Sequence, residues 1–174
     1  MNLPLQFNTK RLHLRPRQRS DLPSIYAYAG DPEVTRLMDW PTHTSISDTE
    51  AHFNASRDPR EDEITWAVTL SSNGTLIGSA ACSAEGHKVS MGYVLAKDYW
   101  GQGYASEMAQ EIVALLSADS SVSRIWATCD TENLASAKVL ENAGLAREGV
   151  LHNWAIRPNL PGAPVRDCFV YAKV

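Results

Sequence analysis

The sequence lacks the cysteine and histidine patterns that mark disulfide-linked and metal-binding proteins. Its three cysteines, Cys82, Cys129 and Cys168, lie far apart and form no CxxC pair. We therefore expect neither a disulfide framework nor a cysteine-rich metal site. The five histidines are scattered without an HExxH or comparable spacing, so no metal is expected.

Long hydrophobic runs and excess positive charge are missing as well. No apolar stretch approaches the roughly 18 residues of a membrane helix, and residues 1–15 lack the long apolar segment of a secretory signal. The 16 Lys and Arg residues stand against 20 Asp and Glu, a net charge of -4, which argues against a nucleic-acid partner. These absences predict a soluble, cytoplasmic protein without a membrane partner, and the acidic balance is compatible with a cationic partner such as an amine.

The composition that remains is that of a globular domain. Hydrophobic residues make up 44% of the 174 residues, close to the globular average, and a chain of this length can bury a sizeable core. No internal repeat, low-complexity tract or Pro/Gly/Ser-rich linker divides the sequence. We therefore expect one domain spanning residues 1–174.

Hydrophobic periodicity and turn residues predict a mixed α/β chain. Strands are expected at residues 7–15, 64–70, 75–83, 87–96, 124–129, 145–154 and 165–173. Helices are expected to start near Ser20, near Asp31 and near Ser47 (the last ending at about Arg57), and to span 104–116 and 133–142, with Gly144 as a C-cap. The turn signals Ser72-Asn73-Gly74 and Glu85-Gly86 indicate that residues 64–96 form an antiparallel meander.

The segment at residues 99–108, YWGQGYASEM, carries two closely spaced glycines between an expected strand and an expected helix. Free N–H groups at a helix start and a close backbone approach at glycine form an anion site. A P-loop is excluded because no lysine follows Gly103, and a dinucleotide fingerprint is excluded because position 106 is Ser106 rather than glycine. From the loop alone, a phosphate site and a simple turn remain equal alternatives.

Five segments in order share a pattern with a known family. They are TKRLHLR at residues 9–15, MGYVL at 91–95, YWGQGYASE at 99–107, NLAS with VLENAGL between 133 and 145, and EG at 148–149. In order and spacing they resemble the GNAT superfamily of acetyl-CoA-dependent N-acetyltransferases, and most closely its ribosomal-protein N-terminal (alanine/serine) acetyltransferase branch. The resemblance implies an α/β (mixed α+β) fold with a central, mostly antiparallel twisted sheet flanked by helices. Trp100 takes the first position of the superfamily's glycine motif and is expected to pack rather than react.

The resemblance also implies how coenzyme A binds. The glycine loop would hold the pyrophosphate through backbone amides, and the pantetheine arm would lie beside the preceding strand like an added strand. Asn133 would contact the arm, although it also suits a helix N-cap, and Lys138 either reaches a phosphate or lies in solvent. The implied cofactor residues are Tyr93, Val94, Leu95, Gly101, Gln102, Gly103, Tyr104, Ala105, Ser106, Asn133 and Lys138.

The catalytic groups are less regular. Many relatives carry an acidic tyrosine seven positions after the asparagine, where this chain has Leu140, and the serine of the ribosomal branch falls at Ser136, our acid candidate. The two familiar base positions hold Ser90 and Ala155. The remaining base candidates are Glu107, His152, His43 and Asp39. An α-amine is partly neutral near pH 7.5, so the reaction needs no strong base.

We therefore expect an N-acetyltransferase that moves the acetyl group of acetyl-CoA to a primary amine, by direct transfer in a ternary complex. The resemblance favours a protein N-terminal amine. A small amine (an amino acid, a polyamine or an aminoglycoside-like compound) is the alternative acceptor. A non-catalytic acyl-CoA-binding module and a generic nucleotide-phosphate binder are rivals from other classes, and a homodimer is left open.

Overall fold

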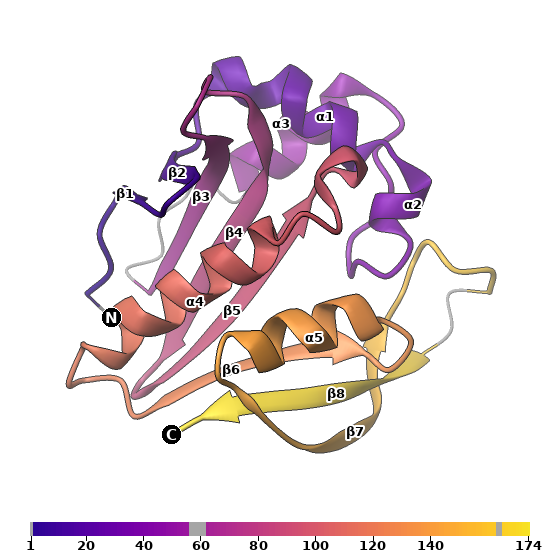
Figure 1. Cartoon of the computed structure of the whole chain (residues 1–174). Coiled ribbons are helices and arrows are strands. Elements are labelled where there is room, and N and C mark those ends of the chain that lie inside the picture. Colours follow the sequence, from indigo (N-terminus) through magenta and orange to yellow (C-terminus); the bar gives the residue numbers. More distant parts are fainter. Residues whose placement is uncertain (1, 56–61, 163–164) are drawn as a thin grey trace.

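The computed structural model describes residues 2–55, 62–162 and 165–174, which are built around one sheet of eight strands (Figure 1). The strands are β1 (Phe7–Asn8), β2 (Leu12–Pro16), β3 (Glu63–Leu70), β4 (Leu76–Glu85), β5 (Lys88–Leu95), β6 (Arg124–Asp130), β7 (Ala146–Ile156) and β8 (Val165–Lys173). The α-helices are α1 (Leu22–Ala29), α2 (Pro32–Thr35), α3 (Ile46–Ala55), α4 (Tyr104–Ser117) and α5 (Leu134–Asn142).

The sheet has the order β1-β2-β3-β4-β5-β6-β8-β7 and is antiparallel except between β5 and β6. The parallel pair is joined only over the first residues of β5, where Lys88, Val89 and Ser90 face Arg124, Ile125 and Trp126. Beyond Ser90 the two strands diverge (Figure 1). The gap that opens there lies near the middle of the sheet and positions the candidate site.

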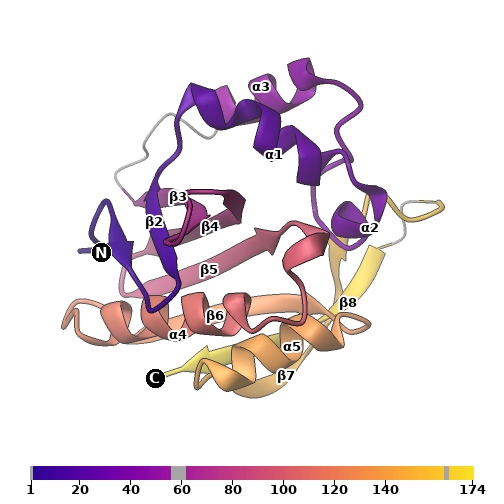
Figure 2. The same ribbon diagram turned by 45° about the horizontal axis from the view of Figure 1, so that its top comes forward.

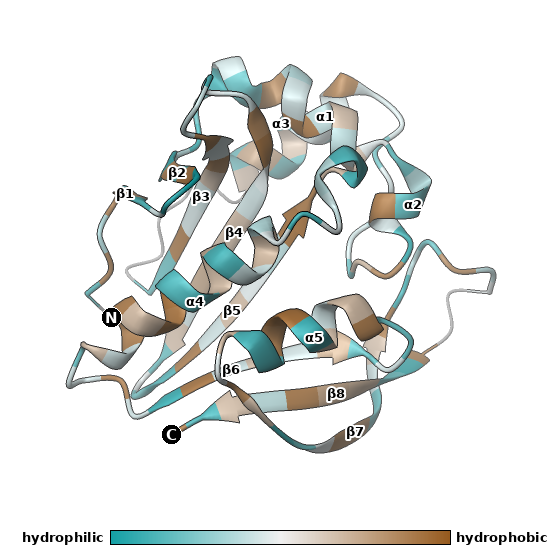
Figure 3. Ribbon diagram, in the orientation of Figure 1, coloured by the Kyte–Doolittle hydropathy of each residue, from teal (hydrophilic) through white to brown (hydrophobic). Residues whose placement is uncertain are grey.

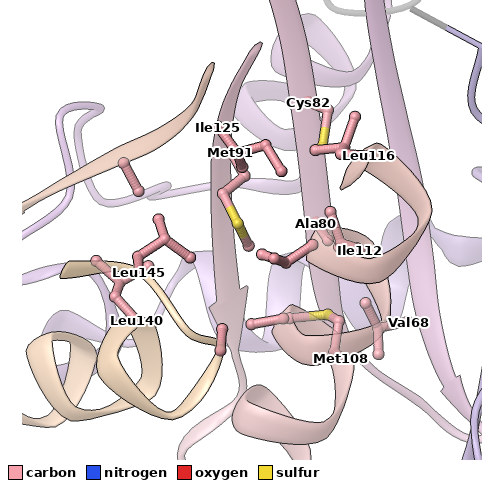
Figure 4. Packing of buried hydrophobic residues seen from close by; sticks show 14 of the residues in the cluster. Val68, Ala80, Cys82, Met91, Met108, Ile112, Leu116, Ile125, Leu140 and Leu145 are labelled. Atoms are coloured by element: carbon pink, nitrogen blue, oxygen red, sulfur yellow. The ribbon is translucent and has the colours of Figure 1, made fainter. Parts of the chain in front are cut away.

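Helices cover both faces of the sheet, with α1 and α3 on one side and α4 and α5 on the other (Figure 2). Met108, Ile112 and Leu116 recur every four residues along α4, and this spacing directs them all into the core, where each is fully buried. Cys82 and Met91 from the sheet pack in the same cluster (Figure 4). Hydrophobic residues lie along β3, β5 and β8, whereas the outer surface of α4 carries hydrophilic residues (Figure 3).

The predicted fold class is confirmed, and the predicted meander is the β3–β4–β5 antiparallel unit. One prediction was wrong: residues 7–15 do not form a single strand. A turn between β1 and β2 is closed by a hydrogen bond from Thr9 N to Leu12 O, so the chain folds back on itself. Asp31 caps α2 as expected, whereas the Asp21 side chain binds Arg15 instead of capping α1.

The remaining boundaries agree with the sequence to within a few residues. Gly144 follows α5 with a φ of 88°, the left-handed geometry of a helix C-terminus. The expected end of the third helix at Arg57 lies outside the described residues. No helix in the described ranges is long and apolar enough to cross a membrane.

Candidate active site

The glycine loop leads from the end of β5 into the first turn of α4. Gly101 and Gly103 have φ values of 71° and 81°, which favour glycine because a side chain in this region clashes with the backbone. Gly103 is the N-cap of α4, and as a glycine it has no side chain to accept a hydrogen bond from the first turn. By contrast, α2 and α5 are capped by the side chains of Asp31 and Asn133.

Without a side-chain cap, the backbone N–H groups in the first turn of α4 are free to donate hydrogen bonds. The first N–H groups of a helix have no partner within the helix, and the helix dipole adds partial positive charge at this end. The loop is also held from behind: the Trp100 indole donates to Leu95 O at 2.8 Å, and the Gln102 side chain donates to Asp98 O at 2.7 Å. Trp100 therefore packs and positions, as expected, and the loop presents backbone amides that suit an anion.

Glu107 in the first turn of α4 binds the β1–β2 turn. Its carboxylate accepts hydrogen bonds from Thr9 Oγ1 (2.6 Å), Arg11 N (2.7 Å) and Arg11 Nε (2.6 Å). Arg11 then donates from Nη1 to Gln102 O at 3.0 Å and lies over the Tyr104 ring. Burial alone would raise the pKa of Glu107, but these hydrogen bonds outweigh burial and hold the pKa below its usual range. Glu107 is thus ionised and links the first turn of α4 to the β1–β2 turn beside the glycine loop.

A cavity of about 330 Å³ lies where β5 and β6 diverge. Three strands, α5 and two loops form its wall. The lining residues are Leu37, Met38, Asp39, Ala81, Cys82, Ser83, Ser90, Met91, Gly92, Tyr93, Trp126, Ala127, Thr128, Cys129, Asp130, Asn133, Ser136, Leu140 and Arg157. The residues singled out from the sequence that the structure brings together here are Tyr93, Asn133, Ser136 and the base candidate Asp39.

Ser136 and Tyr93 form a hydroxyl pair in this cavity. Tyr93 Oη and Ser136 Oγ share a hydrogen bond of 2.8 Å, and the Ser136 backbone carbonyl lies 3.4 Å from the same phenol oxygen. Burial raises the pKa of the Tyr93 phenol, partly opposed by the hydrogen bond to Ser136, so the phenol stays protonated at neutral pH. The sequence indicated the Tyr93 backbone but missed the contact of its side chain, because the two residues lie 43 positions apart.

Asn133 has the N-cap geometry that the sequence suggested. Its Oδ1 accepts from Ser136 N at 3.0 Å, which fixes the first turn of α5 beside the cavity. Leu140, at the position of the absent tyrosine, is buried and lines the same cavity. Lys138 is exposed and lies 3.7 Å from Glu141 Oε2. Val94 and Leu95 continue along β5 toward the glycine loop without lining the cavity.

A charged cluster that the sequence did not indicate lies at the end of β6. Asp130 is 1% exposed and accepts from Arg166 Nε and Nη2, each at 3.2 Å, and from Glu132 N at 2.9 Å. Burial would raise the pKa of Asp130, but the Arg166 hydrogen bonds and the backbone donor lower it on balance. Arg157 Nε lies 3.6 Å from Asp130 Oδ2, and Arg157 Nη2 donates to Cys168 Sγ at 3.3 Å.

Asn159 joins this region to the segment between α2 and α3. Its side-chain amide donates to Thr35 O and Trp40 O, and its oxygen accepts from the backbone N and the hydroxyl of Thr42. All four bonds are 3.0 Å or shorter. These bonds hold the segment that carries Leu37, Met38 and Asp39 against the loop after β7. Asp39 is exposed and also lines the cavity.

Other base candidates lie away from the cavity lining. His152 is 77% exposed on β7 and bonds Asp167 Oδ2 at 2.8 Å. His43 is buried against Thr49 and packs beside Trp40, and burial lowers its pKa. Neither residue lines the cavity, nor does Glu107.

The three cysteines are free and buried. Burial raises the pKa of Cys82 to about 12 and that of Cys129 to about 11, and it also raises the pKa of Cys168. Cys82 and Cys129 line the cavity as neutral thiols at physiological pH. They are therefore poor nucleophiles for a covalent acetyl route.

Comparison with known proteins agrees with this geometry. The acetyltransferase (GNAT) domain family matches residues 11–146. The uncharacterized N-acetyltransferase YnaD of Bacillus subtilis (strain 168) is 30% identical over 147 residues, covering 83% of this chain and 85% of YnaD. A GNAT-family acetyltransferase structure from Bacillus anthracis has a TM-score of 0.85 at 25% identity, covering 97% of this chain and 98% of that one.

Two further solved structures share the fold at lower identity. A ribosomal L7/L12 α-N-protein acetyltransferase, RimL, in complex with coenzyme A has a TM-score of 0.81 at 20% identity, with 98% and 96% of the two chains covered. A spermidine N-acetyltransferase from Vibrio cholerae, in complex with coenzyme A and spermine, has a TM-score of 0.76 at 17% identity, with 93% and 94% covered.

Proposed function

The chain belongs to the GNAT acetyltransferase family and is an acetyl-CoA-dependent N-acetyltransferase, and from this premise we propose that its acceptor is the α-amine of a protein N-terminus. We propose further that residues 1–174 work as a single N-acetyltransferase domain around the one sheet, and that acetyl transfer is direct within a ternary complex. The cytoplasmic location expected from the sequence stays a prediction.

The uncapped N-terminus of α4 carries the assignment of the donor site. An anion is the natural partner for the amides of Gly101 to Ser106, because the N-cap residue Gly103 has no side chain to cap this end of the helix. The pyrophosphate of coenzyme A supplies such an anion. Arg11, braced by Glu107, adds a positive charge beside Gln102 and Tyr104.

The pantetheine arm then has a path from this loop to the cavity. The edge of β5 beyond Ser90 does not pair with β6, so this stretch of backbone, which includes Tyr93 and Val94, is available to an extended arm. Leu95 lies at its end, where its carbonyl already accepts from the Trp100 indole. Asn133 stands across the gap and lines the cavity, close enough along the wall to contact the arm while it caps α5. This route brings the thioester into the cavity that contains Ser136.

The chemistry requires a proton for the departing thiolate and a neutral amine as nucleophile. Ser136 is our proposed donor of that proton, and the Tyr93 phenol, which is protonated at neutral pH, is placed to orient its hydroxyl. Asp130 is a weak base because its pKa lies below the usual range. In this proposal neither Asp130 nor the exposed Asp39 of the lining acts as the base. The amine then arrives partly deprotonated, which favours a peptide α-amine over an alkyl amine.

Among the fold neighbours, RimL is an α-N-protein acetyltransferase and the Vibrio cholerae protein is a spermidine N-acetyltransferase. Because both share only the fold with this chain, the acceptor assignment depends on the amine argument. A small-molecule amine is therefore the second candidate acceptor.

Coenzyme A release from acetyl-CoA, followed with a thiol reagent, tests the proposal. The panel should contain peptides with free N-termini, the same peptides N-terminally blocked, spermidine and an aminoglycoside. Turnover with free but not blocked peptides is the expected result. Turnover with the polyamine or aminoglycoside alone would replace the proposed acceptor, and binding without turnover across the panel would indicate a non-catalytic module.

A thermal-shift comparison tests the donor assignment separately. Coenzyme A should raise Tm clearly more than ATP or NAD does, because ligand stabilisation follows affinity for the folded state. Equal stabilisation by all three compounds would contradict a dedicated coenzyme A site.

A further inference from the structure

Arg157 is a buried cation in the wall of the cavity, and the described residues do not fill its hydrogen-bonding capacity. The residue is 7% exposed and lines the cavity. Its Nε is buried and has no hydrogen-bond partner among the described residues. A second guanidinium nitrogen, Nη2, has only the sulfur of Cys168, which is a weak acceptor. Buried polar groups are normally satisfied, so this exception indicates a partner that comes from outside the chain.

The adjacent carboxylate does not supply that partner. Asp130 Oδ1 already accepts from Arg166 and from Glu132 N, and Oδ2 accepts from Arg166. The distance of 3.6 Å from Arg157 Nε to Oδ2 exceeds that of a hydrogen bond. Asp130 thus holds Arg157 by charge alone and leaves its donors available.

The charge balance of the cluster also leaves room for one anion. Arg157, Asp130, Arg166, Glu132 and Arg36 form a chain of alternating charges, each within 3.6 Å of the next. Within this chain of charges three positive charges stand against two negative ones, an excess of one, while the exposed Asp39 also lines the cavity. The end of this chain that lies in the cavity is Arg157, whereas Arg36 at the other end is exposed.

We propose that Arg157 binds a carboxylate of the acceptor, so that the acceptor is an amine that carries a carboxylate close to its amino group. A guanidinium pairs readily with the two oxygens of a carboxylate, and one carboxylate balances one excess positive charge. The inference rests on the proposed function, because that function brings the amine into this cavity.

Ser136 and Arg157 line the same cavity. An acceptor whose amine meets the thioester near Ser136 while its carboxylate meets Arg157 therefore has both groups within this one cavity. Two sources provide this chemistry: a free amino acid, and a peptide with Asp or Glu at its first or second position.

The test measures kcat/KM for matched acceptor pairs that differ only in the carboxylate. Serine is paired with serinamide, and a peptide that begins Ser-Glu with the same peptide beginning Ser-Gln. Each pair is run with the wild type, Arg157→Gln and Arg157→Lys. Arg36→Gln is the matched control, since it removes one positive charge from the same cluster outside the cavity. Amidation also changes the amine's own reactivity, so the decisive quantity is the change in the ratio between enzymes, from which that reactivity cancels.

The wild type should prefer the carboxylate member of at least one pair about tenfold or more, the effect of a single charge-assisted hydrogen bond. Arg157→Gln should lose this preference, Arg157→Lys should keep part of it, and Arg36→Gln should keep it. The pair that shows the effect identifies the source. A ratio that is the same in the wild type and Arg157→Gln for both pairs overturns the inference and assigns a water molecule to Arg157.

Calorimetric binding of the same compounds to the coenzyme A complex separates the two proposals. Arg157-dependent binding of the carboxylate compounds without turnover of any amine would retain the anion site and reject the proposed function. Turnover of the amines without a carboxylate preference would retain the proposed function and reject the anion site. If Arg157→Gln does not fold, the Ser-Glu and Ser-Gln peptides are compared between the wild type and Arg157→Lys. A smaller preference for the Ser-Glu peptide in Arg157→Lys supports the anion site, because lysine keeps the charge but not the planar guanidinium.

Discussion

Replacement of Glu107 by glutamine distinguishes a structural carboxylate from a catalytic base. The wild-type side chain is 18% exposed and accepts three hydrogen bonds from Thr9 and Arg11. Glutamine keeps the size and one accepting oxygen, but its amide group turns a donor toward the Arg11 guanidinium. At least one charge-assisted bond is lost, and the amide N–H of glutamine faces the N–H donor of Arg11.

The expected cost follows from those contacts. Loss of a hydrogen bond to a charged group, with a donor left unsatisfied, costs about 1–3 kcal/mol of unfolding free energy. For a chain of this size, each kcal/mol lowers Tm by about 2–4 °C. Glu107→Gln should therefore melt roughly 2–12 °C below the wild type at pH 7. Because Arg11 also bonds Gln102 O, the KM for acetyl-CoA should rise while kcat at saturation changes little.

The pH dependence has a definite sign. The pKa of Glu107 is depressed in the folded protein, so its contribution to stability is present above the unfolded pKa of about 4.3 and is lost as pH falls through the folded pKa. The difference in unfolding free energy between wild type and Glu107→Gln should be constant from pH 6 to 8 and shrink in acid below about pH 4.

Urea unfolding at several pH values, combined with steady-state kinetics, measures these quantities. Glu111→Gln, one turn further along α4, removes the same charge away from the β1–β2 turn and should resemble the wild type. A fall in kcat of a hundredfold or more without a loss of stability would refute the structural assignment and return Glu107 to the list of base candidates.

Substitutions at three further positions, Ser136, Gly103 and Asn133, test the remaining site assignments. Ser136→Ala should lower kcat roughly 10²-fold with little change in acetyl-CoA affinity, measured by kinetics and calorimetry, if Ser136 donates the proton; unchanged turnover would end that role. Gly103→Val should weaken coenzyme A binding more than Gly86→Val does, because both glycines have positive φ but only Gly103 lies in the α4 loop; equal affinities would count against the loop. Asn133→Ala should cost about 0.5–2 kcal/mol of stability through the lost cap, whereas Asn133→Asp should fold normally and raise the KM for acetyl-CoA only if the side chain contacts the cofactor.

The donor side of the molecule is readable from sequence because its features are local. The strand, the glycine loop and the start of α4 follow one another between Lys88 and Glu107, and the turn chemistry alone predicts a helix N-terminus after Gly103. The Asn133 cap is equally local, since its partner is Ser136. Periodicity was sufficient for the core helices for the same reason.

Contacts across the sheet could not be predicted in this way. The register of β6 with β8 pairs Asp130 with Cys168 and brings Arg166 beside Asp130 over 36 residues. Thr9 reaches Glu107 across 98 residues because the chain folds back at the β1–β2 turn. The prediction of a single strand over residues 7–15 was wrong because it missed this turn. Long-range pairing therefore decides whether a carboxylate is a brace, a charge partner or a base, and local pattern carries no information on it.

The proposed acceptor depends on the carboxylates in the described cavity lining, which are the buried Asp130 and the exposed Asp39. Asp130 is the buried carboxylate in the wall, and its arginine partner lowers its pKa, so it cannot deprotonate an ammonium group efficiently. At pH 7.5 about a quarter of a peptide α-amine is neutral, against about one part in a thousand of an alkyl amine with a pKa near 10.4. If no side chain acts as the base, the neutral fraction alone favours the α-amine by a factor on the order of 200. If Arg157 adds a preference for a nearby carboxylate, the two effects select together for a peptide N-terminus followed closely by an acidic side chain, and spermidine, which has neither feature, should be a poorer acceptor than the peptides with free N-termini.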